Sequence, residues 1–244
     1  MHRFFVESDL LSPDSFTLNK DDTYHAARVL RLHKGDRAEV ISNGRRYLSV
    51  IDECSSASVV LHPLHELPST ETGISLTLFQ GMPKGDKMDL IVQKAVELGV
   101  SGIVPVLFSR SVARPDKQDA DRKIARWRKI AVEACKQSGR CCVPVLSPVI
   151  PFDALPEHLD MCEQVAVPWE ECAENGPKSF FLRHQQLRSL GIVIGPEGGI
   201  SSEEMEVLTA AGCEAITLGK RILRTETAAI AALSVFSGFY GEME

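Results

Sequence analysis

Hydrophobic and polar positions follow two different patterns along the chain. Up to about residue 67 the β-prone runs are short, and two of them, within residues 37–51, flank Asn43-Gly44. Asn-Gly favours the positive φ angles of a two-residue hairpin turn. A further strand is predicted at 58–61 and one short helix at 22–32. We therefore expect residues 1–70 to form a small β-barrel or β-rich domain.

After a polar linker at 67–73, predicted strands alternate with amphipathic helical patterns. The predicted strands are 74–80, 102–108, 143–146, 164–167, 191–194 and 215–218, and the predicted helices are 87–98, 118–137, 201–211 and 225–239. This alternation is typical of a doubly wound α/β domain with a parallel sheet, which we place at 74–244. The sequence thus predicts two domains.

Charge adds a feature that the hydrophobic pattern does not show. The net charge is −6, which argues weakly against indiscriminate binding to nucleic acid. Basic residues nevertheless concentrate at 121–140, whereas acidic residues without Lys or Arg occupy 153–174. A local basic face is therefore compatible with an acidic protein, although a solvated helix face would explain each run taken alone.

The cysteines and the hydrophobic runs exclude several classes of protein. There are seven cysteines, an odd number, and none forms a Cys-x-x-Cys pair, which argues against a disulfide framework and a zinc cluster. We expect free thiols in a reducing cytoplasm and no metal site. No hydrophobic run approaches the length of a membrane span, and charge appears too early at the amino terminus for a signal peptide.

The first unusual strand end is the turn Gly195-Pro-Glu-Gly-Gly199. Ser201 and Glu204 follow it as a capping box that opens a helix. Glycines allow a ligand to approach the backbone, and a helix start offers unpaired N–H groups. The spacing matches neither a P-loop nor the dinucleotide fingerprint. A tight turn that binds nothing and a ligand-binding loop are equally good interpretations of this turn alone.

The second unusual strand end precedes the last helix, for which Thr225 is the predicted N-cap. The helix dipole favours Glu226 in the first turn, but it disfavours Lys220, Arg221 and Arg224 unless an anion lies there. We therefore expect a carboxylate or phosphate beside this loop. Two glycine-bearing loops without phosphate fingerprints suggest an adenine-containing ligand that is held mainly by backbone groups.

A third element is the predicted strand-to-helix turn before residue 87. Asp86 is a reasonable N-cap, and Lys84 is the candidate binding residue of the turn. A surface amphipathic helix with no function in binding would explain the same pattern.

Five motifs, in order and spacing, resemble one family. They are Pro83–Asp89, Gln93–Gly99, Glu133–Arg140, Gly195–Gly199 and Leu218–Ala228. Together they resemble the RsmE-type small-subunit ribosomal RNA methyltransferases of bacteria, which belong to the SPOUT class. Arg3-Phe-Phe5 and the pattern from His25 to Asp36 fit that family's PUA-like barrel. Departures are small: Ile200 stands where Phe is common, and Ser109 stands where an acidic residue often precedes Arg-Ser.

This resemblance implies an enzyme that uses S-adenosylmethionine to methylate N3 of one uridine in 16S ribosomal RNA, either naked or in the assembled small subunit. It also implies a deep trefoil knot and a homodimer. The general rules of topology disfavour knots, so the sequence pattern did not predict this one. By the same resemblance, the cofactor contacts Pro168, Gly195, Pro196, Glu197, Gly198, Gly199, Leu218, Gly219, Ile222, Leu223 and Arg224.

The chemistry of the uridine suggests the catalytic groups. N3 carries a proton, so transfer requires that proton to leave and the resulting negative charge to be stabilised. Arg224 is the candidate stabiliser. Glu226 is either the base or only a helix-start carboxylate. Lys220 and Arg221 hold RNA phosphate or the cofactor's carboxylate. The candidate RNA contacts are Arg3, Arg28, Arg31, Lys84, Arg122, Lys123, Arg126 and Arg140.

Two other classes of protein would also fit parts of the sequence. A nucleotide-dependent metabolic enzyme would use the same α/β loops, but it should bind mononucleotide phosphates or dinucleotides. A non-catalytic RNA-binding module would explain the barrel and the basic runs, but it leaves the glycine-rich loops without a purpose.

Overall fold

The computed structural model describes residues 1–6, 14–241 and 243, which form two compact units. One unit consists of Met1–Glu71 together with Cys135–Cys142, and the other of Thr72–Ala134 together with Val143–Glu244. The segment Cys135–Cys142 includes the last turn of the long helix α3 (Lys117–Ser138). Neither periodicity nor composition indicates that this segment belongs with the N-terminal residues.

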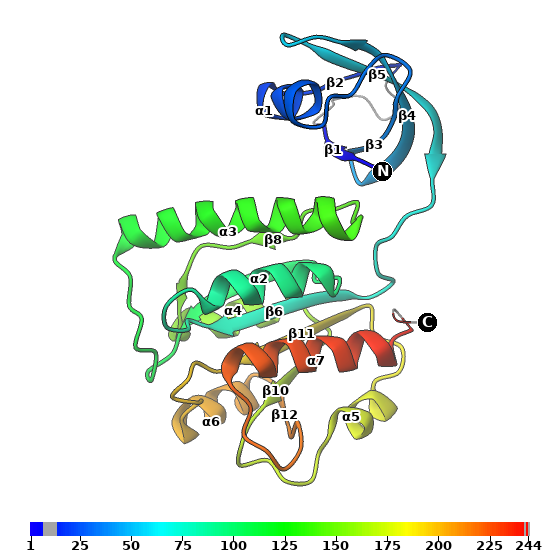
Figure 1. Cartoon of the computed structure of the whole chain (residues 1–244). Coiled ribbons are helices and arrows are strands. Elements are labelled where there is room, and N and C mark those ends of the chain that lie inside the picture. The colour runs from blue at the N-terminus through cyan, green and yellow to red at the C-terminus, as the bar shows by residue number, and fades with distance from the viewer. Residues whose placement is uncertain (7–13, 242, 244) are drawn as a thin grey trace. The chain divides into compact units, whose positions relative to one another are not determined.

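The N-terminal unit contains one curled sheet, a half-barrel, with the strand order β1-β3-β4-β5-β2 (Figure 1). Its strands are β1 (Arg3–Phe5), β2 (Phe16–Thr17), β3 (Arg37–Ser42), β4 (Arg45–Cys54) and β5 (Val59–Leu67). The hairpin between β3 and β4 is confirmed, because Asn43 and Gly44 have φ angles of 52° and 73°. The single helix expected at 22–32 is instead α1 (Lys20–Tyr24) followed by a π-helical turn (His25–Val29).

Hydrogen bonds and an ion pair hold the segment Cys135–Cys142 against the rest of this unit. Arg3 donates from Nε to Glu39 (2.9 Å) and from Nη1 to the carbonyls of Lys136 (3.0 Å) and Gln137 (3.1 Å). Glu71 accepts hydrogen bonds from Arg140 Nη2 (2.5 Å) and from the backbone N–H of Cys142 (2.9 Å). The predicted linker is therefore fixed by contacts to residues 139–142.

The second unit is the predicted parallel α/β domain. Its strand order is β12-β10-β11-β6-β7-β8, with β9 also paired to β7, and every pairing among the described strands is parallel. The strands are β6 (Ser75–Gly81), β7 (Gly102–Leu107), β8 (Val145–Leu146), β9 (Ile150–Pro151), β10 (Gln164–Pro168), β11 (Ser189–Ile194) and β12 (Glu214–Ile216). Besides α3, the helices are α2 (Lys87–Glu97), α4 (Leu155–Leu159), α5 (Pro177–Arg183), α6 (Ser202–Ala210) and α7 (Thr225–Phe239).

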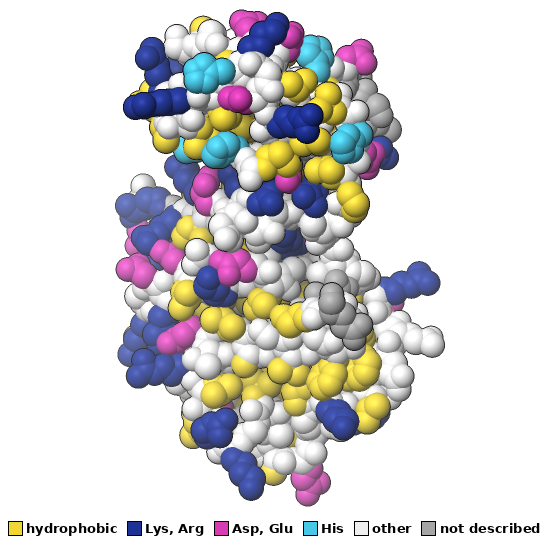
Figure 2. Space-filling model, turned by 45° about the vertical axis from the view of Figure 1, so that its right-hand side comes forward, with side chains coloured by type: hydrophobic (Ala, Val, Ile, Leu, Met, Phe, Trp, Pro, Cys, Tyr) yellow, Lys and Arg dark blue, Asp and Glu magenta, His cyan; other side chains and the backbone are white. Residues whose placement is uncertain are grey.

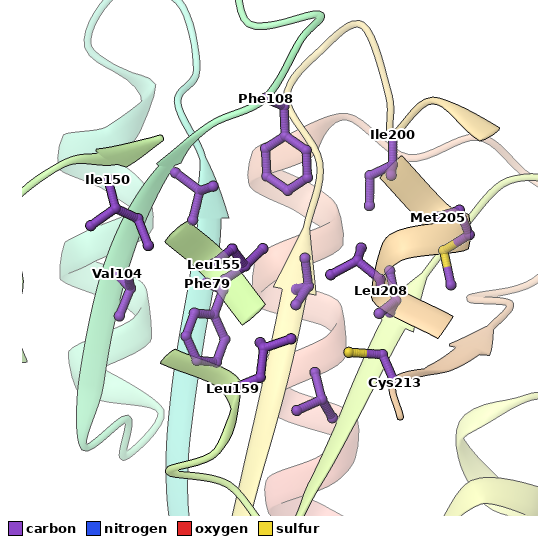
Figure 3. Packing of buried hydrophobic residues seen from close by; sticks show 14 residues of the cluster. Phe79, Val104, Phe108, Ile150, Leu155, Leu159, Ile200, Met205, Leu208 and Cys213 are labelled. Carbon is purple, nitrogen blue, oxygen red and sulfur yellow. The ribbon is translucent and has the colours of Figure 1, made fainter. Parts of the chain in front are cut away.

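One hydrophobic core cluster of this unit lies between the sheet and helices α4 and α6 (Figure 3). In this cluster Phe79 of β6 lies beside Leu155 of α4, and Val104 of β7 and Leu208 of α6 belong to the same cluster; each of the four is at most 2% exposed. Helices α2 and α7 cover the opposite face and pack against each other (Figure 1). None of the described helices combines the length and apolarity needed to cross a lipid bilayer.

Strand β11 lies between β6 and β10, although it follows both in the chain. Its register with β6 runs from Ser75 opposite Ser189 to Gln80 opposite Ile194, so the two strands end side by side. A Cβ on Gly81 would lie 2.4 Å from the backbone nitrogen of Pro196. Only glycine allows this approach, which brings the loop after β11 against the end of β6.

Candidate active site

The two unusual loops predicted from the sequence lie against the same cavity, which has a volume of about 550 Å³. One loop follows β11 and the other follows β12, so both lie at the carboxyl edge of the parallel sheet, where α/β folds bind ligands. All eleven positions expected to contact a cofactor line this cavity: Pro168, Gly195, Pro196, Glu197, Gly198, Gly199, Leu218, Gly219, Ile222, Leu223 and Arg224.

The cavity is also lined by residues that sequence reasoning missed. Lys87, Trp169, Glu170 and Thr217 are among them. Trp169 follows β10, and its backbone N–H donates to the carbonyl of Ile216 (2.9 Å) as an extension of the β10–β12 pairing. The position of Trp169, two residues beyond the predicted strand 164–167, was the available signal for it.

Thr225 does not cap α7, contrary to expectation. The N-cap position is Arg224, which makes no side-chain capping bond. The hydroxyl of Thr225 instead donates to the carbonyl of Gly195 (2.7 Å) and accepts a hydrogen bond from Gln80 Nε2 (2.9 Å). The buried Thr225 side chain thus joins the end of β6, the loop after β11 and the start of α7, because this tertiary partner takes the hydroxyl that a capping bond would use.

The capping box at the start of α6 is confirmed. The side chain of Ser201 accepts a hydrogen bond from the backbone N–H of Glu204 (3.2 Å). The side chain of Glu204 accepts one from the backbone N–H of Ser201 (3.0 Å). The second carboxylate oxygen of Glu204 accepts from the N–H of Ser109 (2.6 Å), in the segment after β7. The glycine-rich loop therefore ends at a rigid helix start.

Lys87, rather than Lys84, contributes its side chain to the loop after β11. Its ammonium nitrogen lies 2.8 Å from Glu197 Oε1 and 3.3 Å from Glu226 Oε2. The hydrogen bond to Glu197 raises the pKa of Lys87. Burial raises the pKa of Glu197, but hydrogen bonds from the Lys87 side chain and the Lys84 N–H outweigh this, so the pKa lies below its usual value. The pair is therefore ionised at neutral pH.

Glu226, one of the two predicted catalytic residues, lies in the first turn of α7, and its side chain is 15% exposed. The sequence left it as a base or as a helix-start carboxylate. The structure adds the ion pair with Lys87 to these two interpretations.

Arg224, the other predicted catalytic residue, is exposed at the rim of the cavity together with Lys220 and Arg221. Within the described part of the chain none of these three cations forms an ion pair. Their charge is therefore available to an anion that enters the cavity.

The predicted RNA contacts fall into two groups. The exposed ones are Arg28 and Arg31 on the N-terminal unit and Lys84, Arg122 and Arg126 on the α/β unit, with Lys123 half-buried. On α3, Arg122 pairs with Asp119, and Arg126 pairs with Asp89. These surface pairs leave the guanidinium groups accessible.

Arg3 and Arg140 have structural roles instead. Arg140 is 5% exposed, and its guanidinium is bonded to Glu71. A guanidinium with this burial cannot reach an RNA phosphate, so the expectation of an RNA contact at Arg140 is wrong. The side chain of Arg3 is similarly used by Glu39 and two backbone carbonyls.

A second cavity of about 670 Å³ lies beside the first, at the end of β7. Arg110 donates from Nη1 to the carbonyl of Gly198 (3.3 Å), and a Cβ on Gly198 would lie 2.8 Å from that of Arg110. Arg110, which the sequence did not single out, thus supports the outer side of the glycine-rich loop.

Comparison with known proteins agrees with this geometry. The model of the RNA methyltransferase domain family matches residues 70–237. The chain is 34% identical over 248 residues to the ribosomal RNA small subunit methyltransferase E of Bacillus subtilis, an alignment that covers 97% of this chain and 96% of that protein.

Solved structures show the same similarity. The ribosomal RNA small subunit methyltransferase E from Neisseria gonorrhoeae, bound to S-adenosyl methionine, has a TM-score of 0.86 and 31% identity, with 100% of both chains covered. A putative methyltransferase from Legionella pneumophila, in complex with the cofactor SAM, has a TM-score of 0.79 and 26% identity, with 97% of this chain and 96% of that chain covered. The chain, with its half-barrel and its SPOUT-type parallel sheet, belongs to the RNA methyltransferase domain family and within it to the small-subunit ribosomal RNA methyltransferases E.

Proposed function

We propose that the protein is an S-adenosylmethionine-dependent methyltransferase that modifies N3 of a uridine in the 16S RNA of the small ribosomal subunit. The observation that carries the proposal is the cavity built by the loops after β11 and β12, with cations at its rim that form no ion pair with any described residue. Family membership supports the reaction class, and relatives named for the small subunit support the substrate.

The residues of the cavity fit S-adenosylmethionine. A volume of about 550 Å³ lies in the range of cofactor sites. Apolar side chains of Ile194, Ile200 and Leu223 face the cavity together with the glycine-rich backbone, a combination that suits an adenosyl group. Lys220 and Arg221 are available to the cofactor's carboxylate. When bound, the cofactor supplies a reactive methyl group on a sulfonium centre.

The residues of this chain then have to activate the uracil. Loss of the N3 proton leaves negative charge on N3, O2 and O4. The exposed guanidinium of Arg224, which no carboxylate of the described residues neutralises, is placed to stabilise this charge. The N3 proton is accepted either by Glu226 or by solvent water.

RNA binding requires a larger surface than the cavity. The exposed cations Arg28 and Arg31 of the N-terminal unit and Lys84, Arg122 and Arg126 of the α/β unit are the proposed phosphate contacts, and Lys123 on α3 is a further candidate. Phosphate contacts position an RNA without specifying its sequence. The target base is extruded from its stack to reach the cavity, as in other base-modifying enzymes. A ribosomal substrate places the protein in the cytoplasm.

We also propose a homodimer that buries the outer face of α7. Hydrophobic side chains gather in a band across the α/β unit in the region of α7 (Figure 2). Val235 is exposed on this helix, and Ile222, in the loop before it, is 89% exposed. Exposed apolar patches mark interaction sites. Sedimentation equilibrium should give a dimer for the wild type and a monomer for Val235→Glu.

A radiolabelled methyl-transfer assay tests the proposed function. Small subunits, large subunits and naked 16S RNA are offered in parallel, and the labelled nucleoside is identified by mass spectrometry. We expect label only on small-subunit RNA, as N3-methyluridine. Label on another base would refute the assigned position, and the absence of any label would refute the enzyme.

Calorimetry separates the remaining classes. S-adenosylhomocysteine should bind, whereas ATP and NAD should not. Binding of ATP or NAD alone would indicate a nucleotide-dependent metabolic enzyme. RNA binding without any binding of S-adenosylhomocysteine would indicate a non-catalytic RNA-binding module.

A further inference from the structure

Lys87 occupies a place where helix electrostatics disfavour a cation. It is the first residue of α2, where the partial positive charge of the helix N-terminus repels an ammonium group. Two carboxylates compensate for this: Glu197 at 2.8 Å and Glu226 at 3.3 Å. They come from the loop after β11 and from the first turn of α7. Lys87 therefore connects three separate elements of the site.

The Lys87 ammonium is the shared cation of the two carboxylates. The side chains of Glu197 and Glu226 are 24% and 15% exposed, so water shields their mutual repulsion only in part. Glu197 has a second donor, since the N–H of Lys84 lies 3.1 Å from its Oε1. Glu226 Oε2 accepts no hydrogen bond from the described residues. Lys87 is thus the group that balances the charge of Glu226.

These contacts fix the loop after β11 at two points. Its first residue, Gly195, is held by Thr225, and its third residue, Glu197, is held by Lys87. The loop forms one wall of the cavity, and residues 217–224 form the other. Fixing the first wall at two points sets the width of the cavity before any ligand enters.

We propose that Lys87 is a positioning residue for methyl transfer, and that Glu226 is the counter-ion of Lys87 rather than the base that removes the N3 proton. This inference rests on the proposed function, because it concerns the positions of cofactor and uracil. Neither Lys87 nor Glu226 exchanges a proton during the reaction; the N3 proton passes to solvent water while Arg224 stabilises the uracil anion. Both act by keeping the glycine-rich loop against the start of α7.

The test compares Lys87→Met, Glu226→Gln and the double variant. Lys87→Met leaves two carboxylates without their cation, so kcat/KM should fall about 100-fold, as expected for misplaced reacting groups. The affinity for S-adenosylhomocysteine, measured by calorimetry, should fall in parallel. The double variant also lacks the carboxylate that Lys87 balanced, so its kcat/KM should exceed that of Lys87→Met about tenfold, because the two residues are coupled.

Two further variants serve as controls. Lys94 forms an ion pair of the same length, 2.8 Å, with Glu97 on the same helix, but it does not line the cavity. Lys94→Met should therefore leave kcat/KM and S-adenosylhomocysteine affinity at wild-type values. Lys87→Arg keeps a cation and should retain more activity than Lys87→Met. This variant also keeps the test valid if Lys87→Met folds poorly.

Two results would overturn the inference. If Lys87→Met matches Lys94→Met in kcat/KM and in S-adenosylhomocysteine affinity, Lys87 has no positioning role. If Glu226→Gln abolishes turnover at every pH with normal cofactor affinity, and the double variant is equally inactive, Glu226 is the base. Failure of the proposed function is separate, because the binding measurements require no RNA. A protein that binds S-adenosylhomocysteine with these couplings but methylates no small subunit refutes the substrate alone.

Discussion

The hydroxyl of Thr225 donates to the carbonyl of Gly195 across 2.7 Å, and this bond joins the first residue of α7 to the first residue of the glycine-rich loop. Gln80 Nε2 donates to the same hydroxyl, so three elements meet at one buried oxygen. Thr225, which the sequence suggested as a helix cap, instead connects the two loops of the cavity by this hydrogen bond.

Replacement of Thr225 by Val should therefore destabilise the α/β unit. The substitution keeps the shape but removes the donor to the Gly195 carbonyl and one of the two hydrogen bonds of the Gln80 amide, which keeps its bond to the Gly81 carbonyl. The cost should be about 2 kcal/mol. Urea unfolding should show this loss, whereas Thr225→Ser, which keeps the hydroxyl, should remain close to the wild type. Equal stability of the Val and Ser variants would contradict the role of the hydroxyl.

Replacement of Arg224 by Ala should separate catalysis from cofactor binding. Loss of a preorganised positive group at the developing anion should lower kcat about 100-fold or more. Calorimetry should show that the affinity for S-adenosylhomocysteine changes little, because the cofactor site is built mainly from backbone. If turnover survives and only cofactor binding weakens, Arg224 is a binding residue and the catalytic assignment is wrong.

Arg140 and Arg122 should differ in what they stabilise. Arg140→Met leaves the carboxylate of Glu71 without its partly buried partner, so the free energy of unfolding should fall by about 3 kcal/mol. Arg122→Met should change stability by about 0.5 kcal/mol or less, since its pair with Asp119 is exposed. It should, however, reduce the salt dependence of RNA binding by about one phosphate contact. An unchanged salt dependence would remove Arg122 from the RNA surface.

The N-terminal unit should lose stability in acid through Glu39. Burial raises the pKa of Glu39, but hydrogen bonds from Arg3 and Arg46 outweigh it, so the folded-state pKa lies below the unfolded value of 4.5. The stabilisation is therefore present above pH 4.5 and is lost as the pH falls through the folded-state pKa. Thermal unfolding between pH 3 and pH 7 should show a weaker pH dependence for Glu39→Gln than for the wild type. The same pH dependence of stability in both proteins would rule out Glu39 as the source of the acid sensitivity.

Local sequence signals predicted the elements that depend on neighbouring residues. The hairpin at Asn43-Gly44, the capping box at Ser201 and the helix α7 follow from turn chemistry and periodicity over a few residues. Short strands such as β1 and β2 and the small helix α5 were missed, because so few residues establish no period.

The details of the site depended on contacts that no periodicity reveals. Both strand-end loops were predicted, but the choice of Lys87 over Lys84 depends on which side chain of the β6–α2 turn faces Glu197. In the same way, Thr225 has the chemistry of an N-cap, and only the approach of Gly195 changes its partner. The local sequence places Arg140 on a basic surface. Its burial depends on Glu71, which is 69 positions away in the sequence and which no local pattern reveals.

The placement of β11 beside β6 has a consequence for the biosynthesis of the protein. Strand β6 can pair with β11 only after the chain has been synthesised beyond Ser189, which lies opposite Ser75. The cavity also requires Thr225, which is synthesised later still. Pairing between such distant segments is slow, because loop-closure entropy is lost before any contact is gained. A nascent chain interrupted before the start of α7 would carry a finished half-barrel but no methyl-transfer site. We therefore expect activity to emerge in a single late step, with no partly active fragment before it.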